Sequence, residues 1–135
     1  MREQPSAPEL LSAVAEFMNE PHAPEHAART TFLRRVAGNV LDIVKRELAL
    51  GPDADAREAA RLRILTGHDG DADTLNVELC DRIAAGDLDL ADPALLDHLW
   101  ASTLDRLAVD QPRYATYQRA AAALSPPSIP SDTKE

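Results

Sequence analysis

The chain has 135 residues, with 23 acidic against 14 basic residues and a net charge of -9. This length suits one domain with a single core, and the acidic surface disfavours binding to nucleic-acid backbones or anionic lipids. Aromatic residues make up only 4%, so the core must consist mainly of Leu, Val, Ile and Ala, which favours close-packed helices over stacked sheets. The single cysteine, Cys80, allows neither an internal disulfide nor a CxxC metal site.

Helix signals begin with Ser6 and Glu9, which have the spacing of a capping box. Apolar residues then repeat with a helical period as far as Pro21 and Pro24. A second helix is predicted over residues 25–50, closed by Gly51 and Pro52. A third helix is predicted from Asp53 or Asp55 to Gly67, so this region should hold two separate helices.

Three more helices follow in the second half of the chain. The fourth is predicted from Asp71 or Asp73 to Gly86, the fifth from Asp92 and Pro93 to just before Pro112, and the sixth over residues 113–124. No segment alternates with the period of a strand. We therefore predict an all-α fold, a single compact antiparallel cluster of five or six helices over residues 5–124, with a flexible Pro- and Ser-rich tail at residues 125–135.

The second helix carries a polar seam beside its apolar side. With about 100° between successive residues, one arc is apolar and is predicted to be buried; it consists of Phe32, Leu33, Val36, Val40, Ile43 and Val44. The polar seam runs along its edge and consists of Arg35, Asn39, Asp42 and Arg46. Two interpretations stay open: these residues form a structural network of ion pairs and packing contacts, or they bind a phosphate or carboxylate group.

Asn76 is a second polar residue on an apolar face, which it shares with Leu79, Cys80 and Ile83. We expect Asn76 to be buried and hydrogen-bonded, and it could meet Asn39 or bind loop carbonyls. Cys80 is expected to be an inert core thiol.

Metal-binding patterns are incomplete. His22 and His26 are four residues apart but have no matching carboxylate motif, so a loop pair is favoured over a metal site. Residues 69–73 begin like a calcium loop, yet Thr74 and Cys80 occupy the positions that require Gly and Glu. We expect neither a metal nor a cofactor.

His98, Ser102 and Asp105 share one face of the fifth helix and have the ingredients of an acid–base or nucleophile group. They lie beside an apolar stripe formed by Leu95, Leu96, Leu99, Trp100 and Leu107. The favoured interpretation is a solvent-facing polar side of an amphipathic helix, so no catalytic residue is assigned.

Three segments together resemble a bacterial family, the domain-of-unknown-function family DUF6285. They are RRVAGNVLDIVKRELALGP (34–52), TLNVELCDRIAAGDLDLADPALLDHL (74–99) and LDRLAVDQPRY (104–114). The positions that carry the resemblance are Arg35, Asn39, Arg46, Glu47, Asn76, Arg106, Pro112, Arg113 and Tyr114. The resemblance implies no established activity. It does imply that the gene for this protein lies beside genes for aminoglycoside-phosphotransferase-like kinases and acyl-CoA dehydrogenases.

Glu47 falls near the centre of the apolar arc of the second helix. A carboxylate in such a place requires a cation, and Arg106 or Arg113 is the expected partner. An ion pair from Glu47 to one of these arginines would join the ends of the second and fifth helices.

Three functional hypotheses follow. The favoured one is a non-enzymatic accessory protein that binds a kinase-like or acyl-CoA-dehydrogenase-like enzyme. The second is a small-ligand protein or enzyme that uses the polar seam for an acyl-CoA or a nucleotide. The third is a structural homodimer with Gly38 at a close helix contact. With no secretory signal and no apolar run near the roughly 20 residues that span a bilayer, we expect a cytoplasmic protein.

Overall fold

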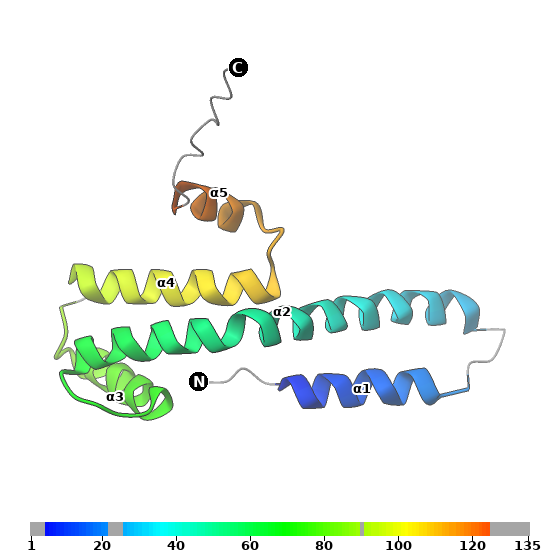
Figure 1. Ribbon diagram of the computed structural model, residues 1–135, viewed down its shortest axis with the longest axis horizontal. Helices are drawn as coiled ribbons and strands as arrows, with labels where there is room; N and C mark the ends of the chain where they lie inside the picture. The colour runs from blue at the N-terminus through cyan, green and yellow to red at the C-terminus, as the bar shows by residue number, and fades with distance from the viewer. Residues whose placement is uncertain (1–4, 22–25, 90, 125–135) are drawn as a thin grey trace, which may run out of the picture.

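One 40-residue helix, α2 (Ala27–Thr66), runs the length of the molecule in the computed structural model (Figure 1). The structure describes residues 5–21, 26–89 and 91–124. Helices α1 (Ala7–Asn19), α3 (Ala72–Ala85) and α4 (Pro93–Asp110) pack against α2, whereas α5 (Ala115–Leu124) packs against α4. The described residues contain no strand, so the predicted all-α class is confirmed.

The predicted tail at residues 125–135 lies outside the described residues. Within the described part of the chain, none of the helices is both long and apolar enough to cross a membrane.

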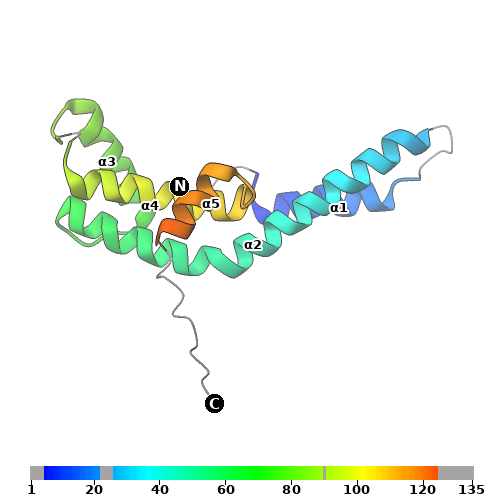
Figure 2. The same ribbon diagram turned by 90° about the horizontal axis from the view of Figure 1, so that it is seen from above.

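The helix end expected at Gly51 and Pro52 is wrong, because Pro52 lies inside α2. A proline in a helix lacks the N–H that would bond the carbonyl four residues earlier, and its ring crowds that carbonyl. Here α4 contacts α2 on both sides of Pro52: Arg46 binds the Val109 carbonyl, and Arg57 binds Asp105. This contact holds the two halves of α2 together, and α2 bends instead of breaking (Figure 2).

The remaining helix ends agree with the local sequence signals. The N-cap residues of α1, α3 and α4 are Ser6, Asp71 and Asp92, and the last two accept hydrogen bonds from backbone N–H groups of their helices. Helices α2 and α3 end at Gly67 and Gly86, which have φ values of 83° and 77°. Glycine suits this left-handed conformation because it has no Cβ to clash with the backbone.

The core lies where α2, α3 and α4 meet. Its fully or almost fully buried side chains are Leu62, Leu75, Leu79 and Leu95. Beside α1, α2 instead buries Thr30, Ala37 and Val44, which recur every seven residues and so lie on one face. The structure therefore has a leucine core at one end and a thin helical hairpin at the other.

The buried arc predicted for this part of α2 is only partly correct. Val44 is buried, but Phe32 and Val36 are 63% and 40% exposed. The predicted arc was about 120° wide, and in the described residues only α1 lies beside this half of α2 (Figure 1). One helix covers only part of so wide an arc, so its far edge is left exposed.

Replacing Leu62 with Ala should lower the free energy of unfolding by about 2–5 kcal/mol, because it leaves a cavity in the leucine core. Ile64, two residues away, is 78% exposed, whereas Leu62 is completely buried. Ile64→Ala is therefore the matched control, with an expected change within about 0.5 kcal/mol. Urea denaturation followed by circular dichroism measures both, and equal losses would contradict this placement of the core.

Candidate functional site

A polar cluster joins α2 to α4 and is named here the α2–α4 cluster; it consists of Arg57, Arg61, His98, Ser102 and Asp105. Arg57 Nη2 donates to Asp105 Oδ1 at 2.7 Å, and Arg61 Nη2 donates to Ser102 Oγ at 3.2 Å. Arg61 Nη2 also lies 3.5 Å from Asp105 Oδ2. Two arginines one turn apart on α2 thus bind the same face of α4.

The expectation that His98, Ser102 and Asp105 face solvent is wrong, because this polar face packs on α2. His98 is only 3% exposed. On the opposite side of α4, Leu96 and Trp100 are 50% and 52% exposed. Periodicity within one helix shows that two faces exist, but the partner decides which face is inside. Here α2 presents arginines, so the polar face is turned inward beside the buried Leu95.

His98 is the most unusual group in the cluster. Burial, reinforced by the positive charge of Arg61, lowers the pKa of its imidazole, and the Glu58 carboxylate only partly opposes this effect. Its Nδ1 and the Nε of Arg61 are buried without a hydrogen-bond partner among the described residues. His98 is therefore neutral at pH 7 and packs as a polar core residue.

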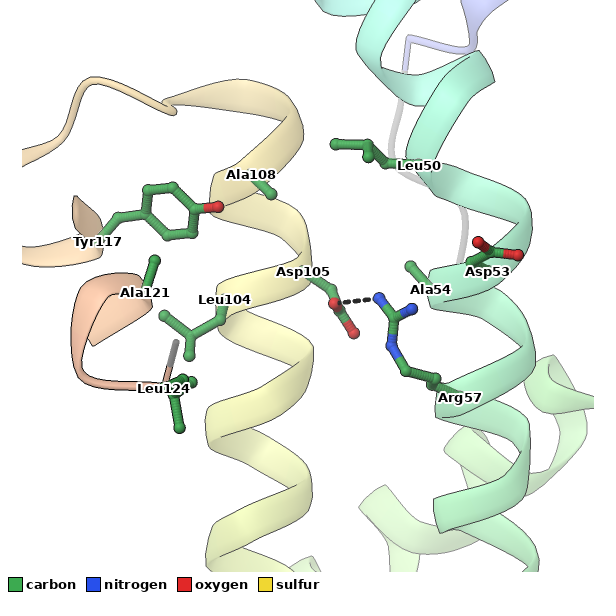
Figure 3. Close-up of a pocket in the computed structure, with 10 residues that line it drawn as sticks. All are labelled: Leu50, Asp53, Ala54, Arg57, Leu104, Asp105, Ala108, Tyr117, Ala121 and Leu124. Carbon is green, nitrogen blue, oxygen red and sulfur yellow. Dashed lines mark hydrogen bonds and ion pairs between the residues drawn. The ribbon is translucent and has the colours of Figure 1, made fainter. Parts of the chain in front are cut away.

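A groove of about 390 Å³ borders the cluster between α2, α4 and α5. Its walls are mainly apolar and include Leu50, Leu104 and Tyr117. Figure 3 shows the Arg57–Asp105 pair bridging α2 and α4 beside these side chains. The groove combines apolar contact area with an ion pair that is already satisfied inside the chain.

A second groove, of about 620 Å³, lies between the start of α1, the middle of α2, the start of α3 and the end of α4. Its charged lining residues are seven carboxylates and one arginine: Glu47, Asp55, Glu58, Asp71, Asp73, Asp105, Asp110 and Arg106. Its charge favours cations over anions. In the ranges that the structure describes, no group of three or more His, Cys, Asp or Glu side chains is arranged to hold a metal ion.

The polar seam predicted on α2 lies outside both grooves. Arg35, Asn39 and Asp42 are exposed and line neither of these two grooves. Arg46 has a structural contact, because its Nε donates to the Val109 carbonyl in the last turn of α4. Such a carbonyl has no partner within its own helix, so Arg46 caps the end of α4.

Asn76 is half-buried and donates from Nδ2 to Glu58 Oε1 at 3.2 Å. The expected hydrogen bond is therefore present, but it does not involve Asn39. Glu58 follows Asn39 on α2 by a distance of about 28 Å along the helix. The two asparagines belong to different ends of the molecule.

The ion pair expected between Glu47 and Arg106 or Arg113 stays a prediction. Glu47 is exposed, although it lines the acidic groove together with Arg106, and Arg113 is exposed beyond the end of α4. The predicted apolar surroundings are missing because the face of α2 at Glu47 opens into this groove. Cys80 is exposed as well, so the expected core thiol is wrong.

Among the described residues, neither His26 nor Gly38 has a contact that indicates a site. His22 lies outside the described residues, and His26 is the exposed N-cap residue of α2. Gly38 is exposed, and a Cβ atom added to it would meet nothing within 4 Å.

Arg57, Glu58 and Arg61 are the residues of this region that sequence reasoning missed. Their only signal is that charged residues recur on the side of α2 that also carries Leu62 and Leu65. When the position of α4 is not known, charged residues at this spacing are indistinguishable from ordinary surface residues.

Replacing Arg61 with Ala should destabilise the fold by about 1–3 kcal/mol, because the partners on α4 lose a buried donor. Arg57 is the matched control, since its side chain is 54% exposed against 23% for Arg61. Arg57→Ala should cost less than about 1 kcal/mol, as expected for an exposed ion pair. Thermal and urea unfolding measure the stability of both variants. A larger loss of stability for Arg57→Ala than for Arg61→Ala would contradict the prediction.

The two described histidines with shifted pKa values should titrate in opposite directions from the ordinary value of 6.5. The pKa of His98 is lowered by burial, whereas the Asp69 carbonyl and Glu78 raise the pKa of His68. Proton NMR of the imidazole rings measures both values in one sample. A His98 resonance that titrates above 6.5 would contradict its burial.

The sign of the effect of His98 on stability follows from linkage. The unfolded chain binds the proton more tightly than the folded chain does, so His98 costs stability as the pH falls below about 6.5. His68 acts in the opposite sense: its contribution is complete below its unfolded pKa and is lost as the pH rises through its folded pKa.

A family model described as "Domain of unknown function (DUF6285)" matches residues 24–114. This segment includes the whole of α2, α3 and α4, and therefore the α2–α4 cluster and most of both grooves. Neither the search of curated proteins nor the search of solved structures gives a match. The matched segment is most of the chain, and the protein belongs to the DUF6285 family.

Proposed function

We propose that this protein is a non-enzymatic accessory protein that binds another protein through the outward face of α4. The observation that carries the proposal is the exposure of Leu96, Leu99 and Trp100, at 50%, 45% and 52%, on a helix whose polar face is buried. A helix in an isolated domain normally turns its apolar side to the core. Here Leu95 enters the core, whereas Leu96, Leu99 and Trp100 stay outside, which is favourable when a partner covers these three side chains.

The α2–α4 cluster makes this orientation specific. Rotating α4 to bury Trp100 would break the hydrogen bonds of Ser102 and Asp105 with the arginines of α2. It would also leave Arg61 partly buried without its carboxylate, which is costly. The apolar face is therefore held outward, ready for contact without rearrangement.

The chemistry of this face suits a protein partner. Exposed apolar side chains that are grouped together mark interaction sites, and tryptophan is enriched among the residues that contribute most to binding. The resemblance to a family encoded beside phosphotransferase-like kinases and acyl-CoA dehydrogenases suggests the partner. We take a kinase-like or acyl-CoA-dehydrogenase-like enzyme as the expected one.

Ligand binding by the polar seam is the less favoured function. Arg35, Asn39 and Asp42 lie exposed on one helix, and small-molecule sites are usually concave and enclose most of the ligand. Arg46, the fourth member, already binds the end of α4.

The test is co-expression with a kinase-like and an acyl-CoA-dehydrogenase-like enzyme of the kinds that the resemblance implies, followed by size-exclusion chromatography. Replacing Leu96 and Trp100 together with Ala should weaken the complex at least about tenfold, because truncated interface anchors commonly cost 2 kcal/mol or more. Met18→Ala is the matched control, since Met18 is 66% exposed on α1. It should leave the complex intact.

Separate elution of the wild-type protein and both enzymes at micromolar concentration, with no change in enzyme activity, would overturn the proposal. If the complex persists in the Leu96/Trp100 variant, the protein has a partner, but α4 is not the surface that binds it.

A further inference from the structure

One stripe of α2 is covered by α4 along its second half and by none of the described helices along its first half. The stripe consists of Phe32, Val36, Asn39, Ile43, Arg46 and Leu50, and is named here the outer stripe. With about 100° per residue these positions fall within an arc of about 80°. α4 reaches the stripe at Arg46, which binds the Val109 carbonyl, and Figure 1 shows α4 beside only the second half of α2.

The exposed half of the outer stripe has the spacing of a helix-pairing surface. Phe32, Val36, Asn39 and Ile43 are separated by four, three and four residues, as in coiled-coil seams. Phe32 and Val36 are 63% and 40% exposed, and Ile43 is half-buried. The side of α2 that binds α4 thus continues unchanged into a segment that has no partner helix among the described residues.

We propose that a second copy of the chain covers this segment, with the two α2 helices antiparallel and a two-fold axis beside Asn39. Asn39 of each copy then faces Asn39 of the other across the axis. A polar asparagine at a single position of an apolar seam sets the register and the number of helices, at a cost in stability.

The charges beside the stripe favour a second copy over an unrelated helix. Arg35 and Asp42 lie seven residues apart on the same edge of the stripe, and both are exposed. In an antiparallel pair the corresponding edges of the two helices face each other. Arg35 of one copy therefore lies opposite Asp42 of the other, and the two-fold axis repeats this ion pair, which makes the surface self-complementary.

The positions agree on a single axis. Arg35 precedes Asn39 by four residues and Asp42 follows it by three, so the ion pairs and the asparagine contact share nearly the same centre. In the same register Phe32 of one copy lies opposite Arg46 of the other, where α4 begins to cover α2. The paired segment is about 22 Å long and ends where the outer stripe is already occupied.

A parallel pair lacks this complementarity. The edge with Arg35 and Asp42 would then face the other edge of the second helix, which carries Leu33, Val40 and Glu47. It would also bring the two α4 helices to the same end of the pair. The antiparallel arrangement places them at opposite ends.

The mass of the full-length protein in solution tests the pairing. Sedimentation velocity at concentrations up to about 100 µM, which detects even weak complexes, should show a dimer for the wild type and a monomer for Val36→Asp. The matched control is Leu41→Asp, because Leu41 is 44% exposed but lies on another side of α2. It should remain dimeric, and circular dichroism checks that both variants keep their helix content.

A monomeric wild type, a dimeric Val36→Asp variant, or loss of the dimer in both variants would each overturn the proposal. The first result rejects a second copy as the occupant of the outer stripe. The other two reject the outer stripe as the place where it binds.

Charge reversal tests the antiparallel register. Arg35→Asp and Asp42→Arg alone should each weaken dimerisation about tenfold, since each replaces two attractive pairs by two repulsive ones. The double variant Arg35→Asp/Asp42→Arg restores opposite charges across the axis and should dimerise like the wild type. Single variants without effect, or a double variant that stays weak, would overturn the antiparallel arrangement.

Discussion

The arrangement of this molecule depends on how two arginines of α2 meet the polar face of α4. Arg57 and Arg61 are one helical turn apart, and together they bind Asp105 and Ser102. Because most buried polar groups are paired, α4 packs on these arginines with the side that supplies Asp105 and Ser102 inward. His98 is buried as a consequence, and Trp100 is turned to the outside.

The same contact explains why α2 is a single long helix. Pro52 removes a backbone hydrogen bond and would normally cost about 3 kcal/mol in a helix interior. Contacts of α4 with Arg46 before the proline and Arg57 after it offset part of this cost. A continuous α2 presents one side to α4 along the second half of its length. Along the first half, none of the described helices covers that side.

Two apolar surfaces result, and they differ in what surrounds them. The face of α4 with Leu96, Leu99 and Trp100 is exposed, and we assign it to a different protein. The outer stripe of α2 is flanked by Arg35 and Asp42, whose opposite charges match their own two-fold copy. One small chain could therefore join two copies of a partner through its own dimer.

The helix boundaries could be predicted from the sequence because a cap depends on residues within one turn of it. Asp71, Asp92, Gly67 and Gly86 end or begin helices as their local chemistry requires. Which face of α2 and of α4 is buried was decided largely by the tertiary structure. The faces of α2 and α4 depend on contacts between residues 41 to 63 positions apart. Local periodicity carries no information about the partner. For the same reason the sequence marked Pro52 as a helix end, whereas packing against α4 keeps the helix continuous.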